Sequence, residues 1–513
     1  MFLPCGLSRS NALEDSVKLR LFFLVLLLPA LLAPAEVTLP KLLASHMVVQ
    51  RNLPVHVWGK AQPGEEVTVG FRGENRAVKA DELGKWSVYL APGEAGGPFQ
   101  LTVQGRKSDG SAQIITLDDI LVGDLWLASG QSNMEFELRN AATAAQDVPA
   151  ASNDRIRLLV VEKHTSDYEL NDAPNGGWKA ATPDSAKYFS AIAWYFAREI
   201  QSKEHVPVGV IDATWGGTVA ESWVRLEAIG EDAALMPLFV SRGKMTAREA
   251  DSAVEQAWEK KQIEEAKAAG KTVPSFPWHA PLNTWAPSLI YNGMIAPLTP
   301  LPIRGVIWYQ GESNSAVERA PLYHRIFRTL IEDWRHQWAE GDFPFLFVQI
   351  ANFKSSPAED WATLREEQRK TLELRNTAMA VTIDIGNPND VHPTNKLDPG
   401  LRLARAARAL SYGEQLEYSG PLFRQAVPVN GAMRLYFDHA KTLKVKGSEL
   451  TGFEVAGKDG NFLPATAKVE GGTVLVSSPE VPNPAFVRYG WSNSPQCNLY
   501  NGDDLPASPF TSR

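Results

Sequence analysis

The protein is a chain of 513 residues, long enough for about three domains of roughly 150 residues each. Apolar residues make up 44% and charged residues 21% of the chain, and 21 Phe, 15 Trp and 12 Tyr supply material for hydrophobic cores. The net charge is −8, with 51 Lys and Arg against 59 Asp and Glu, and no block of basic residues occurs. These values exclude a disordered chain and an electrostatic nucleic-acid binder, so no nucleic acid is expected as a partner.

The first 35 residues have the pattern of a secretory signal. Lys18 and Arg20 precede an apolar run at residues 21–32, and a segment of small residues ending at Ala35 follows it. The apolar run is short and contains a proline, whereas a membrane-spanning helix needs about 20 residues. We therefore expect cleavage after Ala35, a secreted or periplasmic protein, and no stable membrane span afterwards. An uncleaved anchor is the alternative interpretation of residues 1–35.

The rest of the chain divides into three regions of different pattern. Residues 36–117 read as short alternating strands between Gly and Pro turns, and residues 416–513 have the same pattern, so both predict all-β, sandwich-like domains. Residues 118–415 alternate β-rich apolar runs with helical patterns, which is typical of a parallel sheet with helices on both faces. We expect an insertion at about residues 225–290, with a charged surface helix and part of the pocket wall. Trp223, Trp278 and Trp285 are further candidates for that wall.

The central region contains five predicted strands. They are residues 120–128, 208–212, 305–309, 345–350 and 378–385. Between and after them, residues 189–200 and 403–410 place apolar side chains at the spacing of a helix that packs on a sheet. The sequence therefore predicts an α/β domain with a doubly wound parallel sheet.

Residues able to do chemistry follow four of these strands. The segments are residues 129–134 (SGQSNM), 214–218 (TWGGT), 310–314 (QGESN) and 390–393 (DVHP). Open parallel sheets bind ligands at the carboxyl ends of their strands, so we expect the four segments to meet at one edge. Each segment alone is an ordinary turn or helix start, but their combination indicates a functional site.

The residue types in these segments fit acyl transfer. A serine hydroxyl becomes a nucleophile when an imidazole accepts its proton and an acidic group orients the imidazole. Ser132 and His392 are the candidates for nucleophile and base. Asp390 stands two residues before His392, so in an extended segment both side chains point to one side.

Candidate donors to an oxyanion lie in two of the segments. A Gly216-Gly217 turn exposes backbone N–H groups without obstruction by a β-carbon, and Gln310 and Asn314 carry side-chain amides. Loss of one such donor costs about 2.7–4 kcal/mol of transition-state stabilisation. Ser132 does not stand in the Gly-x-Ser-x-Gly turn of α/β-hydrolases, because Met134 replaces the second glycine. This departure points to a serine-hydrolase family other than the α/β-hydrolases.

The motifs resemble one known family. Residues 130–134, 215–218, 308–314 and 390–393 are similar to the sialate O-acetylesterase family of the SGNH hydrolase superfamily, as are residues 291–297 (YNGMIAP) and 46–51 (HMVVQR). The resemblance implies an SGNH-like α/β/α sandwich flanked by N- and C-terminal all-β domains. It also implies a serine esterase that removes O-acetyl groups from carbohydrates without a cofactor.

The resemblance assigns roles to individual residues. It implies Ser132 as nucleophile, His392 as general base, and an oxyanion hole from the N–H groups of Ser132 and Gly217 with an amide of the third loop. That amide is Gln310 or Asn314. Related acetylxylan esterases use the Glu of a Gln-Gly-Glu loop as the acid, so Glu312 is an alternative to Asp390, which we favour.

Sialic acid is the expected carrier of the acetyl group. Acetylxylan or another plant polysaccharide is the alternative substrate, and a carbohydrate-binding protein without turnover is the alternative function. No metal is expected, because the nine His include no i, i+4 pair and no Cys-x-x-Cys occurs. The expected partner is thus an O-acetylated sugar or glycan, and the sequence does not indicate an oligomeric state.

Overall fold

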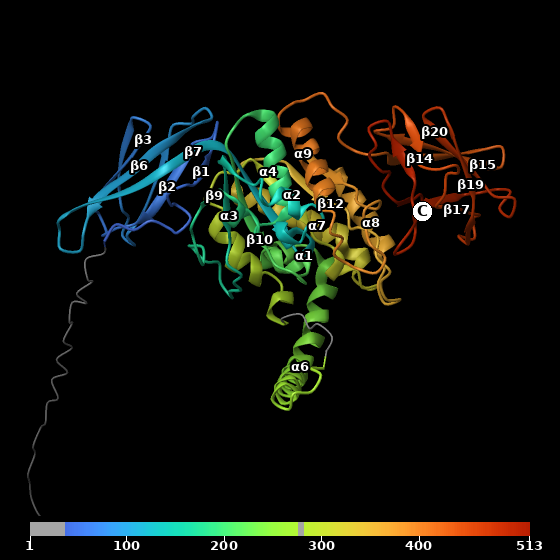
Figure 1. Ribbon diagram of the computed structural model, residues 1–513, viewed down its shortest axis with the longest axis horizontal. Helices are drawn as coiled ribbons and strands as arrows, with labels where there is room; N and C mark the ends of the chain where they lie inside the picture. The colour runs from blue at the N-terminus through green and yellow to red at the C-terminus, as the bar shows by residue number, and fades with distance from the viewer. Residues whose placement is uncertain (1–35, 275–281) are drawn as a thin grey trace, which may run out of the picture.

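The computed structural model describes residues 36–274 and 282–513, so the predicted signal at residues 1–35 lies outside the described residues. An N-terminal β unit, a central α/β body and a C-terminal β unit follow one another along the long axis (Figure 1). Within the described ranges, no helix combines the length and the apolar character that a bilayer crossing requires.

The central body is built on one sheet with strand order β13-β12-β11-β7-β10-β8-β9. Its strands are β7 (Ala112–Gly130), β8 (Asn153–Val160), β9 (Lys179–Ala181), β10 (Val208–Thr214), β11 (Gly305–Tyr309), β12 (Phe345–Val348) and β13 (Thr377–Ala380). All neighbours pair in parallel except β8 and β9 at the edge. Strands β10, β11 and β12 are buried at every position, as expected for a parallel sheet covered on both faces.

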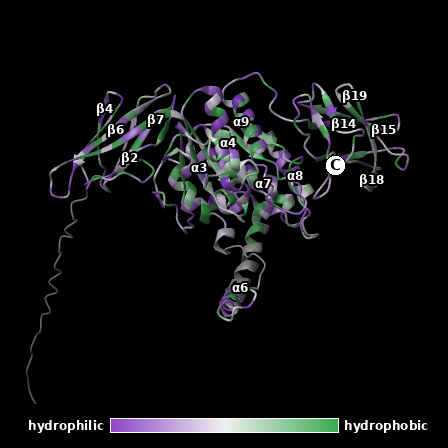
Figure 2. Cartoon of the chain, in the orientation of Figure 1, coloured by the Kyte–Doolittle hydropathy of each residue, from purple (hydrophilic) through white to green (hydrophobic). Residues whose placement is uncertain are grey.

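Helices cover both faces of this sheet. Helices α4 (Ala191–Glu204) and α9 (Leu397–Ser411) pack against each other, as do α7 (Tyr323–Trp338) and α8 (Trp361–Lys370). Phe327 of α7 contacts Phe345 and Phe347 of β12, and because side chains alternate along a strand, the residues between them face α9. Figure 2 shows both hydrophobic and hydrophilic residues on these helices, as expected for amphipathic helices. The predicted SGNH-like α/β/α fold is thereby confirmed.

Strand β7 belongs to two sheets. Its first part pairs with β6 (Gly96–Arg106) and β1 (Val48–Gln50) of the N-terminal unit, whereas its last seven residues pair with β10 and β11. The other N-terminal strands are β2 (Val55–Lys60), β3 (Glu66–Phe71), β4 (Glu74–Lys79) and β5 (Lys85–Leu90). The domain boundary predicted after residue 117 falls inside β7, and the predicted domain limits stay predictions.

The C-terminal unit contains two four-stranded antiparallel sheets and one further strand pair. Its strands are β14 (Leu422–Val429), β15 (Ala432–Asp438), β16 (Leu443–Val445), β17 (Phe453–Ala456), β18 (Phe462–Pro464), β19 (Thr466–Glu470), β20 (Thr473–Ser477), β21 (Phe486–Tyr489), β22 (Leu499–Asn501) and β23 (Phe510–Thr511). The unit has a core of its own, in which Phe423 stacks on Phe510 at 4.1 Å. Arg365 of α8 donates to the carbonyls of Ser492 and Asn493 and ties this unit to the central body.

The remaining helices lie around the sheet edges. They are α1 (Ser132–Glu135), α2 (Ala144–Asp147), α3 (Pro183–Ala186), α5 (Leu226–Gly230) and α6 (Met236–Ala268). Helix α6 projects from the central body (Figure 1), so the structure contains the helix predicted inside the insertion. Residues 275–281 of that insertion, among them the predicted wall residue Trp278, lie outside the described residues.

Candidate active site

Three of the four predicted loops begin at the same level of the sheet. Gly130, the last residue of β7, pairs with Thr214 of β10 on one side and Tyr309 of β11 on the other. A β-carbon at Gly130 would lie 2.2 Å from the carbonyl oxygen of Tyr309, and its φ is 131°, so glycine permits this close approach. The fourth loop enters the same edge just before α9.

The predicted nucleophile and base are in contact. Nε2 of His392 lies 2.8 Å from Oγ of Ser132, although 260 residues separate them in sequence. Ser132 is the first residue of the one-turn helix α1, so its backbone N–H has no carbonyl acceptor within that helix. The pair borders a hollow of about 760 Å³, within the range of ~300–1,000 Å³ typical of ligand pockets.

The two candidate acids occupy different positions. Oδ1 of Asp390 lies 3.9 Å from Nδ1 of His392 and accepts the backbone N–H of the same histidine at 2.8 Å. The first distance is that of an ion pair and exceeds a hydrogen bond. Oε1 of Glu312 instead accepts the side-chain amide of Asn133 at 2.6 Å. Among the described residues, Oε2 of Glu312 is buried without a hydrogen-bond partner.

A buried polar network lies behind the Ser132–His392 pair. The amide of Asn133 donates to Glu312 and also, at 3.0 Å, to the carbonyl of Val391. Nζ of Lys396 donates to Oδ1 of Asn133 at 2.5 Å. Burial lowers the pKa of Lys396 to about 7 and raises the pKa of Glu312. Asn133 therefore connects a lysine and a glutamate that are both shifted towards their neutral forms.

The electrostatics around His392 favour its neutral form. Burial, followed by the positive charge of Lys396, lowers the pKa of His392 below 6.5, and Asp390 opposes this shift. A histidine must be neutral to accept a proton. The surroundings therefore keep the imidazole available as a base at pH 7.

The Gly216-Gly217 loop is held against the nucleophile. The backbone N–H of Gly216 donates to Oε2 of Glu135 at 2.6 Å, and Lys163 donates to Oε1 of the same carboxylate at 2.5 Å. A β-carbon at Gly216 would lie 3.2 Å from Cβ of Ser132, closer than most side chains approach. Gly217, with φ of 73°, lines the hollow. Gly217 and Ser132 thus line the same hollow, and the role of the Gly217 N–H as an oxyanion donor stays a prediction.

The predicted side-chain donors Gln310 and Asn314 lie elsewhere. Nε2 of Gln310 donates to the carbonyl of Thr218 and to Oδ1 of Asn314, and Nδ2 of Asn314 donates to Glu221. Both residues are buried and neither lines the hollow. The third-loop amides are therefore corrected from candidate oxyanion donors to internal braces, because both side chains are buried outside the hollow and donate to groups within the protein.

Aromatic and acidic side chains dominate the walls of the hollow. The aromatic residues are Trp215, Trp285, Phe353 and Trp361, and the carboxylates are those of Glu135, Glu312 and Glu359. Lys163 is the lysine of this wall, and its ammonium is bonded to Glu135. The predicted wall residue Trp285 is thus present, and its indole N–H donates to the carbonyl of Gly217 at 2.7 Å. Trp223, also predicted there, is instead fully buried in the core against Trp308.

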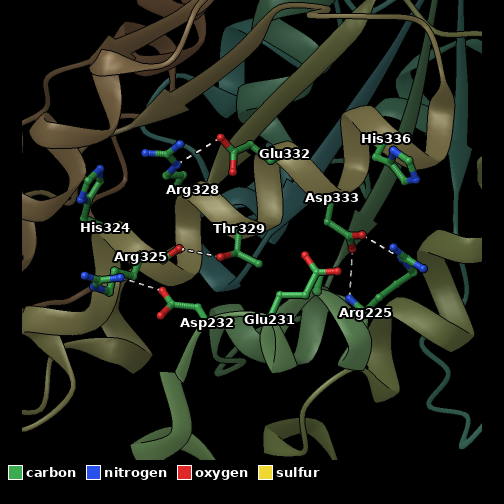
Figure 3. Close-up of a pocket in the computed structure, with 11 residues that line it drawn as sticks. Arg225, Glu231, Asp232, His324, Arg325, Arg328, Thr329, Glu332, Asp333 and His336 are labelled. Atoms are coloured by element: carbon green, nitrogen blue, oxygen red, sulfur yellow. Dashed lines mark hydrogen bonds and ion pairs between the residues drawn. The ribbon is translucent and has the colours of Figure 1, made fainter. Parts of the chain in front are cut away.

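A different hollow, of about 600 Å³, lies beside α7. Figure 3 shows that its charged side chains face one another, and most are paired, as in Arg225 with Asp333 and Arg325 with Asp232. None of the predicted site residues lines it. In the described part of the chain, no three His, Cys, Asp or Glu side chains are grouped as metal ligands would be.

Comparisons with known proteins identify the family. The model of a family described as carbohydrate esterase, sialic acid-specific acetylesterase matches residues 279–409. The sialate O-acetylesterase of Homo sapiens is 30% identical over 88% of this chain and 88% of its own length. The chain belongs to the sialate O-acetylesterase family. The mouse sialate O-acetylesterase is 29% identical over 91% of this chain and 92% of its own.

A solved structure of a carbohydrate acetylesterase from Xanthomonas citri is also similar. It is 41% identical, covers 93% of this chain and all of its own, and superposes with a TM-score of 0.80. As a member of the sialate O-acetylesterase family, this protein is a carboxylic ester hydrolase that removes O-acetyl groups from sugars. The alternative of a binding protein without turnover is thereby not supported.

Sequence reasoning missed four polar residues that shape this sialate O-acetylesterase-like site: Asn133, Glu135, Lys163 and Lys396. Asn133 and Glu135 adjoin the nucleophile, and Lys396 follows His392 by four residues, so proximity to the motifs was the available signal. Lys163 follows β8, a strand absent from the predicted set, and therefore gave no such signal.

Proposed function

We propose that the protein is a secreted serine esterase that deacetylates carbohydrates, with Ser132 as nucleophile and His392 as general base. The distance of 2.8 Å between Oγ of Ser132 and Nε2 of His392 carries this proposal. Such a contact lets the imidazole accept the hydroxyl proton as the oxygen attacks an acetyl carbonyl.

The chemistry proceeds in two halves. Oγ of Ser132 attacks the acetyl carbon while His392 takes its proton, and the carbonyl oxygen becomes an oxyanion. His392 then returns the proton to the sugar oxygen, the ester bond breaks, and the acetyl group remains on Ser132. A water molecule, deprotonated by His392, attacks the acetyl-serine, and collapse of this second intermediate releases acetate and restores the serine hydroxyl.

Two features support the stabilisation of charge in these steps. Ser132 and Gly217 both line the hollow, and we assign their backbone N–H groups to the oxyanion. We assign Asp390 to the orientation of His392, because its carboxylate is the nearer of the two candidates. Catalytic hydrogen bonds are often long in the unliganded protein and shorten when substrate binds, which fits the separation of 3.9 Å.

Replacement of the nucleophile tests this mechanism. Ser132→Ala should lower kcat for 4-nitrophenyl acetate by roughly four to six powers of ten, with the thermal unfolding midpoint unchanged. Ser111→Ala, in an exposed turn of the N-terminal unit, is the matched control and should retain wild-type kcat. Activity within tenfold of wild type in Ser132→Ala would overturn the proposed mechanism.

For the substrate we propose an O-acetylated sugar. O-acetyl sialic acid is one candidate, because the human and mouse relatives are sialate O-acetylesterases. A second candidate is a neutral acetylated polysaccharide such as acetylxylan. The hollow favours it, because the carboxylates of Glu135 and Glu359 and a Lys163 already paired with Glu135 offer little to a sugar carboxylate. Its four aromatic walls suit the apolar faces of pyranose rings.

A comparison of two substrates separates these candidates. Acetate release from O-acetyl sialic acid and from chemically acetylated xylan is measured at equal acetyl concentration, with Ser132→Ala as blank. A kcat/KM at least tenfold higher on one substrate, a discrimination that a single matched contact can supply, identifies the class. For export, mass spectrometry of the mature protein from the culture supernatant or periplasm should find a new N-terminus after Ala35.

A further inference from the structure

A second hollow shares the nucleophile with the first. It has a volume of about 490 Å³, and both hollows are lined by Ser132, Glu135, Lys163 and His392. The first extends over the loops that follow β10, β11 and β12, and the second extends over the ends of β10 and β8. Because β8 lies beyond β10 in the sheet, the second hollow continues from Ser132 towards the end of β8, which does not line the first hollow.

The floor of the second hollow is polar. Asp212 and Thr214, at the end of β10, line it while only 4% and 5% exposed. The hydroxyl of Thr214 donates to Oδ1 of Asp212 at 2.7 Å, and Oδ2 accepts the backbone N–H of Ser190 at 3.3 Å. Burial raises the pKa of Asp212 to about 7. Near neutral pH this carboxyl group can therefore donate or accept a hydrogen bond, and a sugar hydroxyl can pair with it in either role.

The wall of the second hollow offers an aromatic face. Tyr188 is 53% exposed and lines the hollow together with Phe136. Arg139 and Lys187 lie over the Tyr188 ring at 4.6 and 5.0 Å from its centre, and these cation–π contacts hold the ring in place. An aromatic ring beside a hydrogen-bonding floor matches a pyranose, which has apolar faces and a polar rim.

The charges of this hollow disfavour an anionic ligand. Its carboxyl groups are those of Glu135, Glu137, Glu162 and Asp212, and Lys163 is the lysine among its lining residues. Lys163 is already bonded to Glu135, and the two cations beside Tyr188 are also paired, Arg139 with Glu137 and Lys187 with Asp184. A chain that carries a carboxylate on each sugar would meet repulsion here, whereas a neutral chain would not.

We propose that this second hollow is a sugar subsite, so that a neutral oligosaccharide or polysaccharide chain lies across Ser132. The acetylated sugar sits in the aromatic hollow beside His392, and its neighbour along the chain occupies the hollow of Tyr188 and Asp212. This inference rests on the proposed esterase function and names the substrate class of that site. Binding of the neighbouring sugar lowers the barrier only where a chain is present.

Chain length provides the test. Chemically O-acetylated xylo-oligosaccharides of one to six units, O-acetyl sialic acid and 4-nitrophenyl acetate are the probes, with the full-length protein. We expect kcat/KM per acetyl group to rise about tenfold or more as the chain grows from one unit to three, and then to level off. A rise of this size corresponds to the contacts that one additional subsite supplies. Equal kcat/KM for all chain lengths, no release from any chain, or sialic acid as the best probe would overturn the subsite.

Variants at the aromatic wall connect that result to the second hollow. Tyr188→Ala should lower the ratio of kcat/KM on the trimer to kcat/KM on 4-nitrophenyl acetate about tenfold, and Tyr188→Phe should restore it because the ring is retained. Tyr168→Ala is the control, since Tyr168 is 82% exposed and lines neither hollow. An unchanged ratio in Tyr188→Ala would overturn the subsite. If the wild-type protein does not hydrolyse 4-nitrophenyl acetate, that result would instead contradict the proposed function.

Discussion

The side-chain amide of Asn133 donates a hydrogen bond of 3.0 Å to the backbone carbonyl of Val391. Asn133 directly follows Ser132, and Val391 directly precedes His392, so this bond joins the two loops at their reacting residues. The same amide is held from behind by Glu312 and Lys396. The contact between nucleophile and base therefore depends on a buried side chain that touches neither reacting atom.

Asn133→Ala should lower kcat on 4-nitrophenyl acetate by about 10²-fold, the cost of displacing a reacting group by roughly 1 Å. The KM should change little, because the walls of the hollow stay in place. Steady-state kinetics and thermal unfolding measure both effects, with Asn153→Ala, whose amide bonds to Gln201 far from the site, as control. A kcat within twofold of wild type in a folded Asn133→Ala protein would contradict this positioning role.

Asp390→Asn and Glu312→Gln compare the two candidate acids. Because Asp390 lies nearest to Nδ1 of His392, Asp390→Asn should lower kcat by about 10²-fold or more, towards the ~10⁴-fold loss known for a buried triad carboxylate. Glu312→Gln keeps an oxygen acceptor for Asn133 and should cost less. Both variants are measured on 4-nitrophenyl acetate across pH 4.5–9. A greater loss in Glu312→Gln would assign the acid to Glu312.

Lys396→Met should move the acid limb of the pH–rate profile to higher pH. The pKa of Lys396 is about 7, so its ammonium is charged over the range in which His392 titrates. That charge opposes protonation of the imidazole and lowers its pKa, and methionine removes the charge while keeping the chain length. The apparent pKa from kcat/KM should rise, whereas Lys354→Met, on the exposed loop after β12, should leave it unchanged. If the acid limb of Lys396→Met lies at the same pH as in wild type or at a lower pH, that result would refute the electrostatic coupling.

Asp212→Asn should weaken the pH dependence of stability. The folded carboxyl group has a pKa of about 7 against 3.8 for the reference state. As pH rises from 4 to 7 the unfolded chain loses this proton before the folded protein does, so the free energy of unfolding falls across this window. Wild type should therefore lose more thermal stability than Asp212→Asn between pH 5 and 7. Asp154→Asn, at an exposed carboxylate, should behave as wild type, and parallel curves for all three would contradict the prediction.

The sequence alone predicted the layers of the central body. The five predicted strands correspond to β7, β10, β11, β12 and β13, because buried parallel strands are continuous apolar runs. Strand β8 was missed, since charged residues at its start interrupt the apolar run that marks the others. The full extent of β7 was also missed. Its first half alternates apolar and polar residues, whereas its second half is an apolar run, and this change of pattern predicts two separate elements.

The part of the site that lies within the sequence motifs was predictable. The motifs predicted Ser132 and His392, which are in contact, and the glycine loop beside them. They could not show that Gln310 and Asn314 turn inward, because the direction of a side-chain amide depends on partners such as Thr218 and Glu221. Nor could they show that Lys396 and Glu312 share Asn133, a relation that exists only once three distant segments fold together.

The continuity of β7 has a mechanical consequence. One uninterrupted backbone carries the N-terminal layer at one end and the Ser132 loop at the other, so the layer cannot pivot without moving the reacting serine. Truncation of residues 36–111 would strip the first half of this strand of its neighbours β1 and β6. The resulting unpaired strand edge would pair with other chains. The shortened enzyme should therefore aggregate, even though it keeps every proposed catalytic residue.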